Sequence, residues 1–105
     1  MLTPVPFWID GRRVGSRSTR SGNVTNPATG EVTRTVPFAG AEDVDLAVRA
    51  AAAAFPAWRS TPPLRRARIL TRFRELMEQH QQELAGIVTD EHGKVLLDAT
   101  VGPLN

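Results

Sequence analysis

The sequence predicts an α/β fold in which two short β-hairpins precede three amphipathic helices. The first observation is Asp10-Gly11, a pair typical of tight hairpin turns, between the β-prone runs 7–9 and 12–14. The second is a change of hydrophobic period at Ala41, where apolar residues begin to recur every three to four positions. The third is composition: 41% hydrophobic and 23% charged residues in a chain of 105 indicate one globular domain at most.

A second strand pair is expected at residues 23–25 and 31–36, joined across the turn 27–30. Its stretch TNPATGEV could be considered a phosphate-binding loop, but such a loop needs several glycines or a lysine leading into a helix. An Asn-Pro pair starts turns, and Gly30 can adopt a positive φ, so the stretch is interpreted as a turn. The Ser-, Arg- and Gly-rich segment 15–22 has no periodicity and is expected to be an exposed loop.

The first expected helix runs from Ala41 to about Trp58, has acidic residues in its first turn and carries Pro56 near its end. The second starts at Thr61-Pro62, where a capping hydroxyl precedes a proline at the first helical position. Each helix has an apolar stripe along one side. The stripes comprise Val44, Ala47, Val48, Ala51, Phe55 and Trp58 on the first helix, and Ile69, Leu70, Phe73, Leu76, Met77 and His80 on the second.

The two histidines, His80 and His92, lie twelve residues apart without a helical i, i+4 pairing, so a metal site would need carboxylates from elsewhere. His80 is interpreted as a packing or capping residue, with Glu83 three positions later available to cap the third helix. That helix is expected to stop at Gly93. The polar run DEH before it is interpreted as solvated rather than as acid–base machinery.

The charge is unevenly distributed along the chain. Residues 1–74 carry twelve arginines against five acids, whereas residues 75–105 carry one lysine against six acids. The arginine cluster on the second helix admits a rival hypothesis, a small basic module that binds nucleic acid or an acidic protein. Only Arg65, Arg68 and Arg72 are aligned and no aromatic residue is interleaved for base stacking, so a solvated flank is favoured over nucleic-acid binding. The cluster comprises Arg65, Arg66, Arg68, Arg72 and Arg74.

The residues alone predict no catalytic, cofactor-binding or metal-binding site. The chain has no cysteine, which excludes a thiolate nucleophile, and its serines at 16–18 and 60 lack a glycine-elbow context. Gly11 and Gly15 do not have the spacing of a dinucleotide-binding turn. No apolar run approaches the roughly 20 residues that span a bilayer, and the start lacks a leader pattern, so no membrane contact and a cytoplasmic location are expected.

Four segments, in order, resemble the opening section of the aldehyde dehydrogenase superfamily: FWIDGRRV, NPATGEVTRTVPFAGAEDVDLAVRAAAAAFPAW, LRRARILTRFRELM and EHGKVLLDA. The resemblance covers residues 7–99 of 1–105 and implies an N-terminal fragment of that family's cofactor-binding domain. FPAW and EHGKVL are most similar to CoA-acylating methylmalonate-semialdehyde dehydrogenase, with another subfamily as the alternative. The tail 100–105 diverges, and Pro103 would interrupt the helix that relatives continue, which suggests a gene fragment, a frameshift or a deliberate truncation.

The resemblance implies a full-length homo-oligomer that oxidises methylmalonate or malonate semialdehyde with NAD and forms propionyl-CoA or acetyl-CoA. In that family a cysteine thiolate attacks the aldehyde, and the catalytic motifs and nicotinamide pocket come from later sections of the chain. The matching residues here are scaffold: the NPATGEV turn and strand, the helix 44–58, and Glu91, Gly93 and Lys94. This chain alone is therefore expected to be inactive and to bind neither NAD nor CoA.

Overall fold

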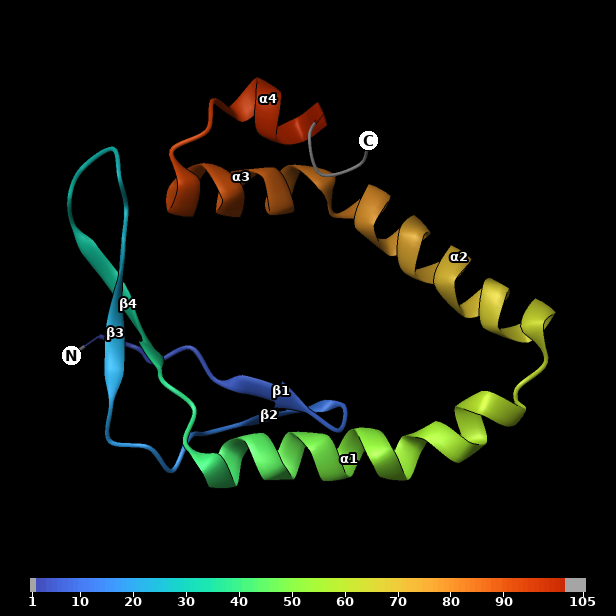
Figure 1. Ribbon diagram of the computed structural model, residues 1–105. Helices are drawn as coiled ribbons and strands as arrows, with labels where there is room; N and C mark the ends of the chain where they lie inside the picture. Colours follow the sequence, from blue (N-terminus) through green and yellow to red (C-terminus); the bar gives the residue numbers. More distant parts are fainter. Residues whose placement is uncertain (1, 102–105) are drawn as a thin grey trace. The chain divides into compact units, whose positions relative to one another are not determined.

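A computed structural model describes residues 2–101 of the chain (Figure 1). The chain divides into two compact units. The first consists of Met1–Thr25 and Val32–Ser60, and the second consists of Asn26–Glu31 and Thr61–Asn105. The first unit therefore contains all the strands and one helix, whereas the second contains the tip of a hairpin and the remaining helices.

The first unit opens with the predicted hairpin. Strand β1 (Phe7–Ile9) pairs antiparallel with β2 (Arg12–Val14), and Ile9 lies opposite Arg12 across a two-residue loop. Both loop residues have positive φ, 54° at Asp10 and 72° at Gly11, as the turn that matches the twist of such a hairpin requires. The Asp-Gly prediction is thus confirmed to the residue.

The second hairpin joins β3 (Ser21–Thr25) to β4 (Val32–Pro37), with an irregularity in register between Val24 and Thr25. The predicted strand pair is confirmed, but β3 begins two residues earlier than expected and shortens the predicted loop. Gly22 has a poor strand propensity, yet a Cβ there would lie 2.8 Å from Cζ of Phe38. The close approach of the Phe38 ring explains why glycine occupies this paired position.

Helix α1 (Ala41–Ser60) starts where predicted and ends two residues later than expected, with Pro56 inside it. In Figure 1 the β1–β2 hairpin runs beside the N-terminal part of α1, and α1 contacts β1. The first unit is therefore a helix with one hairpin laid along it and a second hairpin leading into its start.

The second unit includes Asn26–Glu31, the central six residues of the TNPATGEV stretch. The Gly30 N–H donates to the Asn26 carbonyl at 2.8 Å, the Asn26 N–H donates to the Glu31 carbonyl at 2.9 Å, and the Ala28 N–H donates to Oδ1 of Asn26 at 2.9 Å. Gly30 has a φ of 75°. These bonds use the amide groups that a phosphate cradle would need, so the interpretation of this stretch as a turn is confirmed.

Helix α2 (Pro63–Gln79) begins one residue later than predicted. Pro62 occupies the N-cap position with ψ of 144°, and Pro63 is the first helical residue. The ring of a proline disfavours the helical region for the residue before it, so Pro62 is extended because Pro63 follows it. The predicted cap at Thr61 is therefore wrong by one position.

Helix α3 (Gln81–His92) follows after His80, which takes the N-cap position without a capping side-chain hydrogen bond. Nδ1 of His80 instead lies 3.1 Å from Oε2 of Glu83, so the predicted capping role of the histidine side chain is wrong. The predicted stop is confirmed: Gly93 has φ of 77°, and its N–H donates to the Thr89 carbonyl at 2.9 Å.

A fourth helix, α4 (Leu96–Val101), was not predicted, so the expected count of three helices is wrong. Six residues are too few to show a helical period in the sequence. Nε2 of Gln81 on α3 donates to the Thr100 carbonyl at 2.7 Å, and Ala85 and Ala99 are fully buried. Contacts with α3 therefore stabilise α4. The predicted interruption at Pro103 lies outside the described residues.

The described part of the chain buries little apolar surface. Ala85 and Ala99 are its buried apolar residues, and no large side chain among residues 2–101 is fully buried. The predicted apolar stripes are present but exposed: Val48 is 60% exposed and Phe73 is 59% exposed. None of the described helices is long and apolar enough to cross a bilayer.

Candidate functional site

The chemically capable side chains of the described residues do not converge on one centre. Residues 2–101 contain no group of three or more histidines, cysteines, aspartates or glutamates that could hold a metal ion. The His80–Glu83 pair is exposed at the junction of α2 and α3, and His92 is the exposed last residue of α3. A pair of this kind offers two ligands, fewer than a protein metal site uses.

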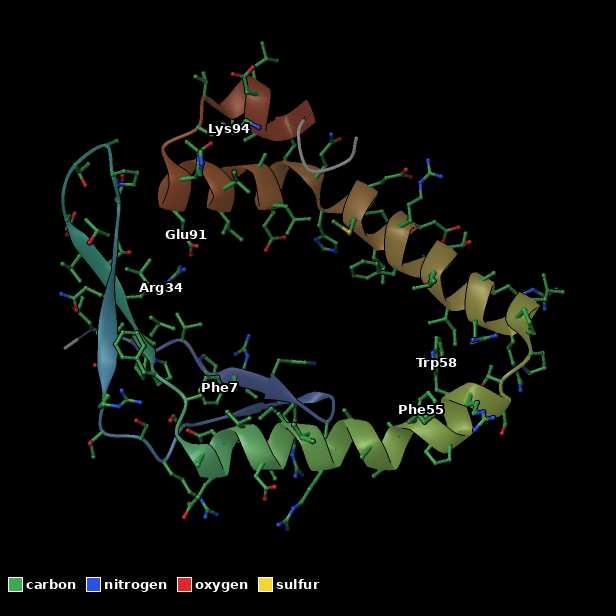
Figure 2. All side chains as sticks on the ribbon, viewed as in Figure 1. Phe7, Arg34, Phe55, Trp58, Glu91 and Lys94 are labelled. Atoms are coloured by element: carbon green, nitrogen blue, oxygen red, sulfur yellow. The ribbon has the colours of Figure 1, made fainter. Side chains whose placement is uncertain are left out.

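The polar segment around the end of α3 is mostly solvated, as predicted. Asp90, Glu91 and His92 are exposed, and Lys94 is half-buried in the connection to α4. Figure 2 shows the Glu91 side chain on the side of α3 that faces away from α4. Gly93 is also exposed, but a Cβ there would lie 3.0 Å from Cγ of Pro27 in the TNPATGEV turn. The end of α3 therefore lies against the TNPATGEV turn at Gly93.

The arginine cluster of α2 is partly neutralised within its own helix. Nη1 of Arg72 lies 3.2 Å from Oε2 of Glu75, and Nε of Arg74 lies 3.0 Å from Oε1 of Glu78. The three aligned arginines do border one shallow depression of about 530 Å³, lined by Thr61, Arg65, Arg68, Ile69 and Arg72. An exposed basic patch remains, but one of its three aligned charges is already paired.

The most organised polar centre lies at the start of α1, around Asp43. Asp43 is 6% exposed as a residue. It accepts hydrogen bonds from the Ser16 hydroxyl at 2.6 Å, the Gly40 N–H at 3.1 Å and the Arg17 N–H at 3.3 Å. The bond from Ser16, followed by the bond from Gly40, lowers the pKa of Asp43 from its ordinary value of 3.8, against the opposing effect of desolvation.

This arrangement is structural rather than catalytic. The N–H of Gly40, at the start of α1, has no hydrogen-bond acceptor within the helix. The carboxylate of Asp43, three residues later, accepts this hydrogen bond, as the acidic residue of a capping box does. The other two bonds hold the connection between β2 and β3 against the helix. Sequence reasoning assigned the acids of this turn to the helix dipole alone; the spacing from Gly40 was the signal for the cap, whereas nothing indicated the link to Ser16.

Two depressions flank α1 within the first unit. One, of about 300 Å³, has charged residues in its lining, among them the ion pairs Arg17–Glu42 at 3.2 Å and Asp45–Arg49 at 2.8 Å. The other, of about 340 Å³, is almost wholly apolar and is lined by Phe7, Trp8, Ile9, Ala39, Asp43, Val44, Ala47 and Val48. Neither contains a nucleophile with an adjacent base, so neither provides the groups for covalent catalysis.

Short antiparallel hairpins followed by helices with exposed apolar stripes give the described residues a mixed α/β fold. A model of the aldehyde dehydrogenase family matches residues 14–102, and the chain belongs to that family. The family predicted from the four sequence segments is thereby confirmed.

Two curated relatives have the same substrate in their names. The chain is 46% identical over 91 residues to malonate-semialdehyde dehydrogenase of Pseudomonas aeruginosa, a match that covers 87% of this chain and 18% of the relative. It is 52% identical over 87 residues to malonate-semialdehyde dehydrogenase 2 of Geobacillus kaustophilus, covering 83% of this chain and 18% of the relative.

A solved structure has the same backbone arrangement. It is a Sinorhizobium meliloti protein assigned as a methylmalonate-semialdehyde dehydrogenase, complexed with NAD. The TM-score is 0.92 at 44% identity, and the match covers 96% of this chain and 21% of that chain. The chain thus spans about a fifth of the length of the proteins that it matches.

Proposed function

We propose that this chain is the N-terminal segment of an NAD-dependent, CoA-acylating methylmalonate- or malonate-semialdehyde dehydrogenase and that it contributes scaffold to the cofactor-binding domain. The observation that supports this most directly is the combination of a TM-score of 0.92 with coverage of 21% of the neighbour's chain. The match covers only a fifth of the neighbour's chain, yet the two backbones agree closely over that part. The segment therefore has the conformation that the corresponding residues have within the longer protein. The names of the relatives supply the substrate class.

The proposed reaction needs groups that this chain does not carry. A cysteine thiolate adds to the aldehyde carbon, hydride passes from the resulting thiohemiacetal to NAD, and a thioester remains on the enzyme. The substrate carboxylate leaves as CO₂ and the α-carbon takes up a proton, and the thiolate of CoA then displaces the enzyme sulfur to give propionyl-CoA or acetyl-CoA. Because the chain contains no cysteine, it cannot form either enzyme-bound intermediate. Its role in this proposal is to hold the domain that performs the steps.

NAD and CoA are accordingly proposed as ligands of the full-length enzyme, not of these 105 residues. The described glycines at positive φ, Gly11, Gly30 and Gly93, lie in hairpin turns or at a helix end rather than in a strand-to-helix turn. Calorimetric titration of the chain with NAD should therefore show no saturable heat. Binding in the micromolar range would contradict this part of the proposal. We further propose that the full-length enzyme is a cytoplasmic homo-oligomer that acts on a small semialdehyde.

A graft tests the scaffold role. The matching residues of this chain would replace the 91-residue segment of the Pseudomonas aeruginosa enzyme to which they correspond. We expect the chimera to produce NADH from malonate semialdehyde in the presence of CoA, whereas the isolated chain produces none. A chimera without its nucleophilic cysteine serves as the inactive control. Turnover proportional to the isolated chain, or a folded chimera without activity, would contradict the proposal.

A further inference from the structure

We propose that the Asp10-Gly11 turn is a site of spontaneous backbone modification, where aspartate converts to isoaspartate through a succinimide and the β1–β2 hairpin loses its register. The reaction needs no enzyme and no cofactor. Its reactants are the side-chain carboxyl of Asp10, the peptide nitrogen of Gly11 and water. The turn favours the reaction by its residue types, its exposure and the hydrogen bonding of the two reacting groups.

The succinimide forms when the peptide nitrogen of Gly11 attacks Cγ of Asp10. A C–N bond forms, the C–O bond of the carboxyl hydroxyl breaks, and the hydroxyl leaves as water with the amide proton. Water then adds to one of the two imide carbonyls. Addition at Cγ restores aspartate, whereas addition at the backbone carbonyl gives isoaspartate, in which the main chain runs through Cβ and Cγ. The product has the mass of the starting chain, and no atom is oxidised or reduced.

Glycine after the aspartate leaves the attacking nitrogen accessible. It has no Cβ, so no side chain hinders the five-membered ring as it closes. Asp10 and Gly11 are both exposed, and a Cβ built at Gly11 would meet no atom within 4 Å. The tip of the hairpin therefore has room for the ring and for water. The other aspartates of the chain precede residues that carry side chains, namely Val44, Leu46, Glu91 and Ala99.

Hydrogen bonds do not hold the two reacting groups of the turn. The Gly11 N–H and the Asp10 carboxylate make no hydrogen bond or ion pair with another residue in the described range 2–101. The other four aspartates lie in α1, α3 and α4. There the nitrogen after the aspartate can be engaged by the helix: after Asp43, the Val44 N–H donates to the Gly40 carbonyl at 3.1 Å. A nitrogen held in this way is kept from the carboxyl beside it.

Asparagine forms the same succinimide, but the described asparagines are poorly placed for it. Asn26 precedes Pro27, whose nitrogen carries no proton to lose. Asn23 precedes Val24 inside β3, which is paired with β4. The reaction should therefore concentrate at the first hairpin.

Isoaspartate adds one methylene group to the main chain of a two-residue loop. The loop has φ of 54° at Asp10 and 72° at Gly11, and these dihedral angles allow Ile9 to lie opposite Arg12. A lengthened loop cannot close with the same turn, so the register of β1 on β2 is lost. Because β1 contacts α1, the modification also changes the surface that lies along the helix (Figure 1).

The test incubates the 105-residue chain for several weeks at neutral pH and physiological temperature. After digestion, isoaspartyl methyltransferase with a labelled methyl donor quantifies isoaspartate, and fragmentation mass spectrometry locates it. We expect about tenfold more isoaspartate at position 10 than at any other aspartate, because only position 10 is followed by glycine. Hydrogen exchange of the aged chain should show lower amide protection along β1 and β2.

Two substitutions at position 10 keep a dipeptide that favours this hairpin turn. Asp10→Asn forms the same succinimide with loss of ammonia, a better leaving group than the hydroxyl of an ionised carboxyl, so isoaspartate should appear sooner. Asp10→Gly removes the carbon that is attacked, and its aged hairpin should keep its amide protection.

Three results would overturn the modification site: no isoaspartate at position 10, an even spread over the aspartates, or no conversion in Asp10→Asn. Isoaspartate at position 10 with unchanged hairpin protection would overturn the proposed loss of register. So would an equal loss of protection in the aged Asp10→Gly chain, which cannot form the imide at this position.

Discussion

The hydroxyl of Ser16 donates a 2.6 Å hydrogen bond to the carboxylate of Asp43, twenty-seven residues later in the chain. This bond ties the connection after β2 to the first turn of α1. The backbone N–H of Ser18 in turn donates to Oγ of Ser16 at 2.9 Å, so the serine oxygen also organises the loop. Two hairpins and a helix are thus joined at one carboxylate.

Removal of this bond should raise the pKa of Asp43 toward its ordinary value. Ser16→Ala deletes the largest cause of the lowered pKa and leaves the Gly40 and Arg17 donors in place. A carboxyl titration by NMR should show a midpoint below 3.8 in the parent chain and a higher midpoint in the variant. Ser18→Ala, which leaves the Asp43 bonds untouched, is the control. Equal midpoints in parent and Ser16→Ala would contradict the role assigned to this bond.

The same shift has a defined effect on stability. Because the pKa of Asp43 is lower in the folded state, its stabilising effect is fully present above the ordinary value of 3.8 and is lost as the pH falls through the folded value. Asp43→Asn should therefore weaken the amide protection of the first turn of α1 at neutral pH, and the difference should disappear only once the pH has fallen below the folded pKa of Asp43, which lies under 3.8. Hydrogen exchange of the Gly40 amide, which donates to Asp43, is the direct measurement.

Gly93 and Gly30 should differ in their response to alanine. Both have φ near 75°, where a Cβ costs roughly 1–2 kcal/mol. The new Cβ at position 30 meets open space, whereas at position 93 it lies 3.0 Å from Cγ of Pro27. Gly93→Ala should therefore lower the protection of its own amide against exchange more than Gly30→Ala does. Combining Gly93→Ala with Pro27→Ala should remove the additional loss of amide protection. Equal losses of protection in Gly93→Ala and Gly30→Ala would show that the contact with Pro27 contributes nothing.

The isolated chain should be helical but loosely packed or self-associating. Its apolar stripes are exposed, and each large side chain left without a partner forgoes about 1.5–3 kcal/mol, against roughly 5–15 kcal/mol for a whole domain. We expect helical circular dichroism together with binding of a dye for apolar surface. Phe55→Ser and Phe73→Ser should each reduce dye binding, and Ala53→Ser should not. A compact monomer with a sharp cooperative melt and no dye binding would contradict this expectation.

The basic patch of α2 should not act as a nucleic-acid site. Arg72 is paired with Glu75, so only Arg65 and Arg68 of the aligned set lack an acidic partner among the described residues. Fluorescence anisotropy with a DNA duplex should show binding no tighter than nonspecific binding, about 10⁻⁴ to 10⁻⁶ M at physiological salt. The control changes Arg12, Arg13 and Arg34 together to Gln. Changing Arg65, Arg68 and Arg72 together to Gln should alter the DNA affinity no more than this control does. A steep salt dependence lost only in the first variant would favour the rival hypothesis of a basic binding module.

Local sequence signals determined the elements whose cause lies within a few residues. The Asp10-Gly11 turn and the Gly93 helix stop were predicted to the residue, because positive φ is a property of those residue types and positions. The start of α1 at Ala41 followed from a change of period that can be read in one window. The family itself followed from four segments in order. In each case the signal can be read from the order and type of residues along the chain without knowledge of a spatial partner.

Only the tertiary structure decided the features that depend on residues distant in sequence. The Ser16–Asp43 bond, the Phe38 ring over Gly22 and the burial of Ala99 leave no periodic or motif signal, because each requires a partner that local propensity does not specify. For the same reason α4 was missed, since its six residues are supported by contacts with α3. The sequence predicted the amphipathic stripes. It did not predict that they remain exposed among the described residues, because burial depends on which other surfaces are present to cover them.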